Sequence, residues 1–253
     1  MHNKEMLAVK LIIIVGVALG IAVLIFHFTK KKSSKENYIS SPTSIKNKLI
    51  KMLKTTKDIL DKNNIAFFAD SGTALGCIRH RGFIPHDHDI DLGVASTSIE
   101  NILKLKPLFE KHNLILRYTD GHTIREIDSK ESKEFRKMIA DPTRLQKFID
   151  DFDYKSRVQK GAFYKIINKS DDIYGGCDMD LFLYAYDKTN DNYPVLCNCS
   201  TSLGKEVYFK DIGKTILSKY EDIQIPIVID TLEYLDRLYG RDCVIKDEHG
   251  NLI

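Results

Sequence analysis

The chain has 253 residues, enough for one well-buried domain of roughly 200 residues with an appendage, or for two small domains. Its formal charge of +3 arises in the first 40 residues, where six lysines stand against two glutamates, so the remainder is nearly neutral. A nearly neutral body lacks the broad basic surface of a nucleic-acid-binding protein. We therefore expect no nucleic-acid partner.

A long apolar run precedes the body of the chain. Residues 11–26 are uninterrupted apolar, and their neighbours extend the run to the roughly 20 residues that span a bilayer. A cleaved signal peptide is the alternative, but its apolar core is usually shorter and no small-residue cleavage site follows here. We predict a single-pass N-terminal transmembrane anchor over residues 1–29, a polar stem over 30–44 and a catalytic body over 45–253. Lysines flank both ends of the run, and charge alone leans towards a cytosolic body.

The body begins with alternating helical and strand-like patterns. Apolar residues at helical spacing predict an amphipathic helix over residues 45–63. A short buried strand is predicted over 65–69, and residues 70–73 interrupt it before a brief helix over 74–80. Residues 89–94 alternate polar and apolar side chains, which predicts a strand.

Later segments continue the alternation. The capping-box pattern at residues 97–100 predicts a helix that reaches about Lys106 or continues through the Pro107 region. Residues 119–160 are charged and lack strand alternation, so we expect a mostly helical, solvent-facing insertion. Strands are predicted over 114–116, 163–167 and 179–184, and a last helix over 231–239 with Gly240 as its C-cap signal. Together these elements predict an α/β (α+β) fold with a mixed sheet flanked by helices.

Three carboxylates in this pattern indicate a metal site. On a strand, Asp89 and Asp91 share one face with their Cα atoms about 6 to 7 Å apart, while the apolar residues between them share the other. Asp180, on the strand predicted later, supplies a third carboxylate. Such groups repel one another unless a cation lies among them. We therefore predict that Asp89, Asp91 and Asp180 bind Mg²⁺ or Mn²⁺ and support phosphoryl or nucleotidyl transfer.

Substrate contacts are expected beside this site. Gly72, at the strand-to-helix turn, allows a phosphate to approach the backbone, and Ser71 and Thr73 offer hydroxyl groups. Arg79 and Lys165 fit phosphate contacts and ordinary surface charges about equally well. The candidate substrate-binding residues are Gly72, Ser71, Thr73, Arg79, His80, Asp87 and Lys165.

The aspartate-rich stretch also fits two structures without catalytic chemistry. Aspartate-rich loops are usually solvated turns, and a lone Asp-x-Asp pair is a weak motif. An EF-hand calcium loop would place Asp87, Asp89 and Asp91 at its first, third and fifth positions. However, Leu92 stands where that loop requires glycine, and Ser98 stands where it requires glutamate, so the EF-hand hypothesis fails at two positions.

A longer motif contains these residues. The sequence GTALGCIRHRGFIPHDHDIDLG, residues 72–93, closely resembles the signature of the LicD family, which includes fukutin and fukutin-related protein. Further resemblance occurs at residues 163–166, 180–182 and 233–240. The resemblance extends over roughly residues 60–243. It implies a nucleotidyltransferase-like fold and metal-dependent transfer of a phosphorylated alcohol, such as phosphocholine or ribitol phosphate, from a CDP-linked donor to a glycan acceptor on protein or lipid.

The resemblance also assigns roles by position. It implies that Asp89 and Asp91 are metal ligands and that Asp180 is the third carboxylate and candidate base. Gly72 is expected to form the turn at the donor phosphate, and phosphate contacts are expected from Lys165 and Arg79. The family usually has Trp and Asp at two further positions, where this chain has His86 and His88. The rim of the site is therefore altered, which leaves open a different substrate.

Two predictions have alternatives: the side of the membrane on which the body lies, and the activity of the protein. Eukaryotic relatives carry one N-terminal anchor and a catalytic body in the Golgi lumen, and this layout is similar, so we expect a lumenal body, with a cytosolic body as the alternative. The alternatives to the transferase are a non-catalytic, glycan- or partner-binding member of the same fold, and a nucleotidyltransferase that acts on a small molecule.

Overall fold

A computed structural model of the chain describes residues 42–150, 162–171, 177–186, 195–197 and 208–245. The chain divides into two compact units, residues 1–44 and 45–253, and the second holds the sheet and the candidate site. No helix among the described residues combines the length and apolar character needed to cross a bilayer. The apolar run over residues 11–26 lies outside them, so the N-terminal anchor stays a prediction.

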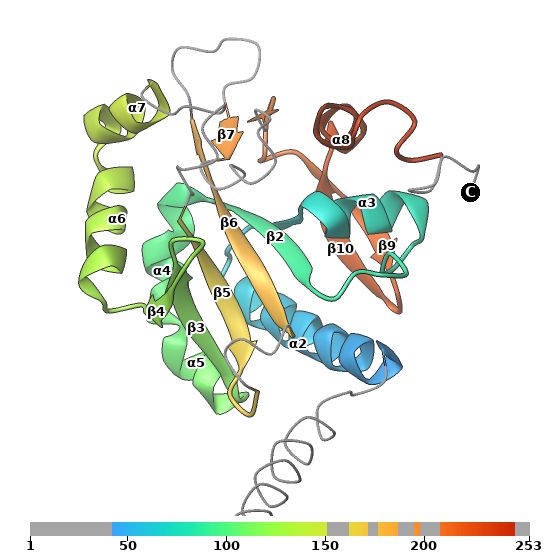
Figure 1. Cartoon of the computed structure of the whole chain (residues 1–253), viewed down its shortest axis with the longest axis horizontal. Coiled ribbons are helices and arrows are strands. Elements are labelled where there is room, and N and C mark those ends of the chain that lie inside the picture. The colour runs from blue at the N-terminus through green and yellow to red at the C-terminus, as the bar shows by residue number, and fades with distance from the viewer. Residues whose placement is uncertain (1–41, 151–161, 172–176, 187–194, 198–207, 246–253) are drawn as a thin grey trace, which may run out of the picture. The chain divides into compact units, whose positions relative to one another are not determined.

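A mixed sheet forms the centre of the second unit (Figure 1). Its strands follow the order β1-β2-β6-β5-β3-β4, while β7 pairs with the C-terminal end of β6 and with β8. β2 and β6 run parallel, whereas the other described pairs are antiparallel. The predicted mixed sheet is confirmed. The bounds are β1 Phe68–Ala69, β2 Ile90–Ala95, β3 Leu114–Thr119, β4 Ile124–Glu126, β5 Phe163–Asn168, β6 Asp178–Tyr186, β7 Val195–Cys197 and β8 Tyr208–Phe209.

The two faces of this sheet differ in chemistry. One face carries a fully buried row, in register across β2, β6 and β5, of Leu92, Leu181 and Tyr164. One residue away along the strands, Asp91 pairs in register with Asp180, and Asp180 pairs with Lys165. Because side chains alternate along a strand, this charged row points to the opposite face. The predicted separation of an apolar from an acidic face is observed.

Helices flank the sheet, as predicted. α2 (Pro42–Lys62) starts inside the predicted stem and contributes Leu49, Leu53 and Leu60 to the core. Figure 1 shows α6 and α7 at the β3–β4 end of the sheet, and α3 and α8 at the other end, beside β9 and β10. The remaining bounds are α3 Ser71–Arg79, α4 Ile99–Lys104, α5 Lys106–Lys111, α6 Lys130–Ala140, α7 Pro142–Asp150, α8 Thr231–Tyr239, β9 Thr215–Tyr220 and β10 Ile223–Val228.

The capping box predicted at residues 97–100 is wrong. Residues Ser96–Ser98 form a 3₁₀ turn, and Ser98 precedes α4 with φ −85° and ψ −12°, without a side-chain capping bond. A capping residue needs extended backbone for its side chain to reach back to the helix. Here the chain is already helical at Ser98. The expected single helix is also divided into α4 and α5, because Pro107 follows the break at Leu105.

The hairpin of β9 and β10 was not predicted. Its six register pairs are joined by Glu221 and Asp222, and Glu221 adopts a φ of +55°. The sequence lacks the Asn-Gly or Asp-Gly turn that usually marks a tight hairpin, and Pro226 argues against a strand. The two-stranded sheet of β9 and β10 tolerates Pro226 because each strand has one free edge among the described residues.

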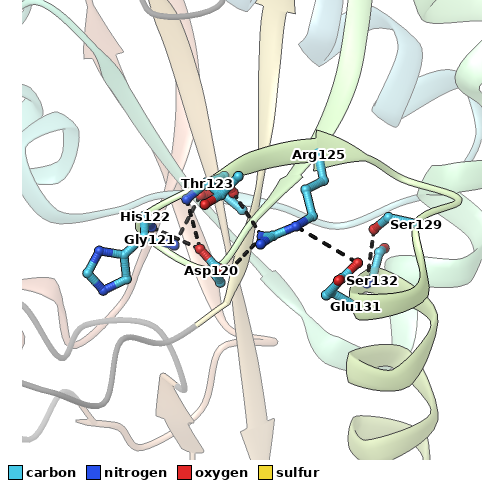
Figure 2. Close-up of polar contacts among 9 residues, drawn as sticks. Asp120, Gly121, His122, Thr123, Arg125, Ser129, Glu131 and Ser132 are labelled. Carbon is cyan, nitrogen blue, oxygen red and sulfur yellow. Dashed lines mark hydrogen bonds and ion pairs between the residues drawn. The ribbon is translucent and has the colours of Figure 1, made fainter.

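The insertion over residues 119–160 is helical only in part. α6 and α7 confirm the helical prediction, but β4 adds a strand at the sheet edge, and residues 151–161 lie outside the described part. Figure 2 shows the hydrogen bonds that close the β3–β4 turn. Asp120 Oδ1 accepts hydrogen bonds from the backbone N–H groups of His122 (2.9 Å) and Thr123 (2.8 Å). Asp120 Oδ2 accepts a hydrogen bond from the side chain of Arg125 (2.5 Å). Arg125 also lies 3.8 Å from Glu131 on α6. The turn is thereby linked to the following helix.

Candidate metal and phosphate site

The site is organised at the first turn of α3. Asp70 precedes the helix with extended backbone (φ −122°, ψ 167°), and its Oδ1 accepts a hydrogen bond of 2.7 Å from the Ser71 N–H. Asp70 is fully buried and also accepts hydrogen bonds from the Tyr184 hydroxyl (2.7 Å) on β6 and the Tyr234 hydroxyl on α8. Burial raises the pKa of Asp70, and the tyrosine hydrogen bonds offset this only in part. One carboxylate thus joins three elements of the chain.

The same turn holds Asp91 in place. The Gly72 N–H donates to Asp91 Oδ2 (3.1 Å), the Asp91 N–H donates to Thr73 Oγ1 (2.8 Å), and the Asp70 N–H donates to the Asp91 carbonyl (3.0 Å). Thr73 is fully buried, so in this structure its hydroxyl positions Asp91 and faces no solvent. Ser71 has a φ of +41°, a strained conformation for a residue other than glycine.

Gly72 has no room for a side chain. A Cβ atom added there would lie 2.8 Å from Asp87 Oδ2 and 3.4 Å from Asp91 Oδ2. The first distance is shorter than real Cβ contacts, so Asp87 would have to move. The glycine therefore keeps the space between two carboxylates and the helix terminus open, which agrees with its predicted place beside a phosphate.

The three predicted metal ligands come together. Asp89, Asp91 and Asp180 each offer a carboxylate oxygen, and these three atoms lie within 4.8 Å of one another. Asp91 is 9% exposed and Asp180 is 8% exposed. Burial, followed by the charges of Asp89 and Asp180, raises the pKa of Asp91 well above its ordinary value. The strands β2 and β6 produce this arrangement because they run parallel with Asp91 opposite Asp180.

Lys165 contacts this cluster. Its Nζ forms ion pairs with Asp180 and with Asp178 Oδ2 (2.9 Å), and it lies 5.4 Å from the centre of the Phe163 ring. Burial lowers the pKa of Lys165, but the charges of Asp180 and Asp178 outweigh it and raise the pKa overall. Burial raises the pKa of Asp180 to about 7, and Lys165 opposes this rise. The lysine therefore already has carboxylate partners before any phosphate arrives.

The donor set fits a divalent cation. Carboxylate oxygens are the ligands that Mg²⁺ and Mn²⁺ prefer. Lys165 supplies one positive charge to a group of carboxylates that includes Asp89, Asp91 and Asp180. Burial, and after it the charges of the neighbouring carboxylates, raises the pKa of Asp91. A divalent ion at this position would supply the missing positive charge.

The loop before β2 adds Asp87 to the site. Burial raises the pKa of Asp87 to about 7, and the hydrogen bond and charge of Asp89 act in the same direction. The loop is tied back to α2, because Lys46 Nζ donates to the carbonyls of Ile84 (3.3 Å) and Pro85 (3.2 Å). His86 and His88, the two positions that differ from the family pattern, are exposed on this loop.

Arg79 and His80 lie at the far end of α3. Arg79 Nε donates to His80 Nε2 (2.8 Å), and Arg79 Nη1 donates to the Cys243 carbonyl (3.3 Å). Arg79 lies seven positions after Gly72, which corresponds to roughly 10 Å along a helix. The predicted substrate contacts of Arg79 and His80 stay a prediction.

Sequence reasoning missed several residues of the site. The sequence pattern marks Asp70 only as a break in the chain, and it gives no role to Asp178, Tyr184, Tyr234 or Tyr239. Burial and the charges of Asp91 and Asp70 raise the pKa of Tyr239, which places this partly exposed phenol near the cluster. A polar residue directly before a helix is a capping signal, so Asp70 was recognisable. Tyr184 carried no comparable signal, whereas Tyr234 and Tyr239 lie in the family resemblance at residues 233–240, which assigned them no role.

Comparison with known sequences identifies the central segment. Residues 64–170 match the family described as LicD/FKTN/FKRP, nucleotidyltransferase domain. The predicted resemblance to the LicD family is confirmed over this segment. The LicD match includes Asp89, Asp91 and Lys165 but ends before Asp180.

Two curated relatives share parts of the chain. An uncharacterized protein of Rickettsia prowazekii (strain Madrid E) is 36% identical over 76 residues, which cover 30% of this chain and 29% of that protein. An uncharacterized protein of Rickettsia typhi (strain ATCC VR-144 / Wilmington) is 29% identical over 137 residues, which cover 51% of this chain and 42% of that protein. Each match spans less than half of the relative's length.

Among solved structures, the lincomycin-bound lincosamide antibiotic adenylyltransferase LnuA superposes with a TM-score of 0.37 at 10% sequence identity. The superposition covers 79% of this chain and 90% of that one.

Proposed function

We propose that the protein is a metal-dependent transferase with a nucleotidyltransferase-like fold. It moves a phosphorylated alcohol of the phosphocholine or ribitol-phosphate type from a CDP-linked donor to a glycan acceptor. The observation that carries the proposal is the convergence of Asp89, Asp91 and Asp180 to within 4.8 Å, beside the Gly72 turn of a LicD segment.

Asp89, Asp91 and Asp180 would hold Mg²⁺ or Mn²⁺ in this proposal. When bound, the ion neutralises charge on the phosphate oxygens of the donor. Gly72 leaves room for a phosphate oxygen beside the first turn of α3. Its N–H and the buried Thr73 hydroxyl hold Asp91, which fixes the direction of that carboxylate.

Proton transfer from the acceptor is assigned to Asp180. This role is supported by the family resemblance and by the register of Asp180 on β6 with Asp91 on β2. The acceptor hydroxyl would transfer its proton to Asp180 while its oxygen forms a bond to the phosphorus of the alcohol phosphate, and CMP departs with the electrons of the broken P–O bond. Lys165 contacts Asp180 and brings a positive charge next to the transferred phosphate.

The proposal includes a membrane location. We propose that residues 1–29 anchor the protein and that the body lies in the lumen, with a cytosolic body as the alternative. A C-terminal reporter that is shielded from added protease in intact vesicles supports the lumen, whereas a reporter that is cleaved in those vesicles supports the cytosol.

Release of CMP tests the activity. The full chain, in mild detergent with Mn²⁺, is incubated with a panel of CDP-alcohols and a glycan acceptor. We expect CMP release from one donor, loss of that release in Asp89→Ala, and normal release in Asp58→Ala, which changes an exposed aspartate on α2. CMP release by Asp89→Ala at the normal rate would contradict the assigned site.

The same assay separates the alternatives. Pyrophosphate release from a nucleoside triphosphate, without CMP release from any CDP-alcohol, would favour a nucleotidyltransferase that acts on a small molecule. Absence of both products, together with absence of Mn²⁺ binding, would favour the non-catalytic binding protein.

A further inference from the structure

A cavity lies on the opposite side of the sheet from the three carboxylates. Its volume is about 360 Å³, within the size range of small-molecule sites, and it is open to solvent and lined by α2, the turn between α5 and β3, and the end of β5. Leu114 and Asn168 line it and pair in register across β3 and β5. Asn168 lies three residues after Lys165 on the same strand, so their side chains point to opposite faces. The cavity is therefore separate from the proposed metal site.

Lysines give this cavity its charge. Lys48 and Lys51 line it from one face of α2, because they are three positions apart on the helix, and Lys169 lines it from the end of β5. Lys48 is paired with Asp171. Lys51 and Lys169 form no ion pair with any residue in the part of the chain that the structure describes. Lys51 thus has no ion-pair partner there. Lys169 acts at longer range on the exposed Glu110, whose pKa is lowered by the Lys106 hydrogen bond and then by the charges of Lys106 and Lys169.

Lys51 differs from the other lysines of its helix. Among the described residues, the other five all have partners: Lys46 donates to two backbone carbonyls, while ion pairs engage Lys48, Lys54, Lys57 and Lys62. Like charges three positions apart on a helix repel, so the Lys48–Lys51 spacing carries a small cost. A ligand with negative charge in the cavity would offset that cost.

Asn168 adds a hydrogen-bond donor. Its Oδ1 accepts from the Ser170 N–H (3.0 Å) and from Ser170 Oγ (2.8 Å), which turns the amide oxygen towards the loop. Its NH₂ group is then the part of the amide left for a ligand. Met52 and Leu114 supply buried apolar surface on the same wall, which suits the carbon skeleton of a small phosphorylated molecule.

We propose that this cavity binds a phosphate monoester group, held by Lys51, Lys169 and the Asn168 amide. Ammonium groups act on a phosphate as compact point charges, and two of them balance a dianion. The group can belong to a soluble sugar or alcohol phosphate or to the headgroup of a phosphatidic-acid-type lipid. The inference does not depend on the proposed transferase activity, since it uses none of the metal-site residues.

Isothermal titration calorimetry tests this site. EDTA is added to remove divalent metal ions, because a metal ion bound to the three carboxylates would itself bind phosphate. The full chain in mild non-ionic detergent is titrated with glycerol 3-phosphate, and separately with dioctanoyl phosphatidic acid. We expect a dissociation constant of about 1 mM or tighter for at least one probe. Binding of the first probe alone indicates a soluble ligand, and binding of the second alone indicates a lipid headgroup.

Charge-neutral variants locate the binding. Lys51→Gln and Lys169→Gln should each weaken binding roughly tenfold, because each removes one charge-assisted contact. Lys62→Gln, on the same helix but paired with Asp58 and 77% exposed, should bind within about twofold of the wild type. Absence of binding by the wild type, or equal effects of all three variants, would overturn the proposal.

Discussion

The Tyr184 hydroxyl donates a hydrogen bond of 2.7 Å to Asp70, linking the central strand β6 to the first turn of α3. Tyr234 on α8 contacts the other oxygen of the same carboxylate. Asp70 in turn donates its N–H to the Asp91 carbonyl. The position of the proposed metal ligand Asp91 thus depends on two tyrosines that lie far from it in sequence.

Removal of either tyrosine hydroxyl should destabilise the fold. Tyr184→Phe and Tyr234→Phe each take one donor from a fully buried carboxylate, which typically costs about 1 to 3 kcal/mol. Urea unfolding followed by circular dichroism measures the loss. Tyr118→Phe is the matched control, because Tyr118 is also buried in the sheet and its hydroxyl donates to no described residue. Equal losses in all three variants would argue against a special role for Asp70.

The buried Asp70 should make stability fall as pH rises. Burial raises its folded pKa above the ordinary value of 3.8, so above that pH the unfolded chain releases this proton while the folded chain keeps it. The stabilisation is complete below pH 3.8 and is lost as pH climbs through the folded pKa. In Asp70→Asn the side chain is an amide that does not titrate, so this pH-dependent contribution is absent. The unfolding free energy of this variant, relative to the wild type, should therefore increase from about pH 4 to about pH 7. A difference that is flat over this range would contradict the raised pKa.

Gly72→Ala should weaken metal binding without unfolding the protein. The added Cβ would displace Asp87 and crowd Asp91, and changes beside metal ligands typically cost about tenfold or more in affinity. Calorimetric titration with Mn²⁺ measures this. Gly240→Ala is the contrasting control, since Gly240 has a φ of +92° and open space around it. That variant should lose about 1 to 3 kcal/mol of stability but keep its Mn²⁺ affinity.

Mn²⁺ should raise the melting temperature through Asp89. An ion that binds only the folded state at a concentration about 100 times its dissociation constant stabilises by about 2.7 kcal/mol. Asp89→Ala should lose this increment. Without metal the variant should be at least as stable as the wild type, because the charge of Asp89 acts unfavourably on Asp91 and Asp87. An Mn²⁺-dependent shift that persists in Asp89→Ala would remove that residue from the metal site.

The β3–β4 turn should depend on Asp120. Asp120→Ala removes two backbone hydrogen bonds and the Arg125 contact drawn in Figure 2, and we expect a loss of about 1 to 2 kcal/mol. Asp120→Asn keeps an acceptor for both backbone N–H groups and loses only the charge, so its loss should stay below about 1 kcal/mol. Thermal melts distinguish the two. Neither variant should change Mn²⁺ affinity.

Local sequence patterns predicted much of the fold. The stripe of α2 and the alternation of β2 depend on periodicity within a few residues, and both elements were predicted within a few residues of their observed bounds. The hairpin of β9 and β10 lacked such a signal, since its turn is Glu221-Asp222. The split of α4 from α5 accompanies Pro107, a residue signal that the sequence shows but that the single predicted helix did not take into account.

The candidate site likewise combines residues that local sequence pattern predicts with residues that it does not. Asp89 and Asp91 lie two residues apart, so a strand prediction was enough to put them on one face. The strand predicted over residues 179–184 supplied Asp180, and the family resemblance at residues 180–182 agreed with it. The contacts of Asp70 with Tyr184 and Tyr234 bridge more than 110 positions and arise only when β6 and α8 pack against α3. No pattern within one segment encodes them. The phosphate contact of Arg79, which lies at the last residue of α3, stays a prediction.

The place of β6 in the sheet has a consequence for shortened forms of the protein. β6 joins the β1–β2 pair to the β5–β3–β4 group, yet it is made from residues 178–186, after the LicD match has ended. A fragment that stops at residue 170 would contain two separate groups of strands with exposed inner edges and only two of the three ligands. During synthesis, likewise, the acidic centre cannot form until the ribosome has released the strand that closes the gap.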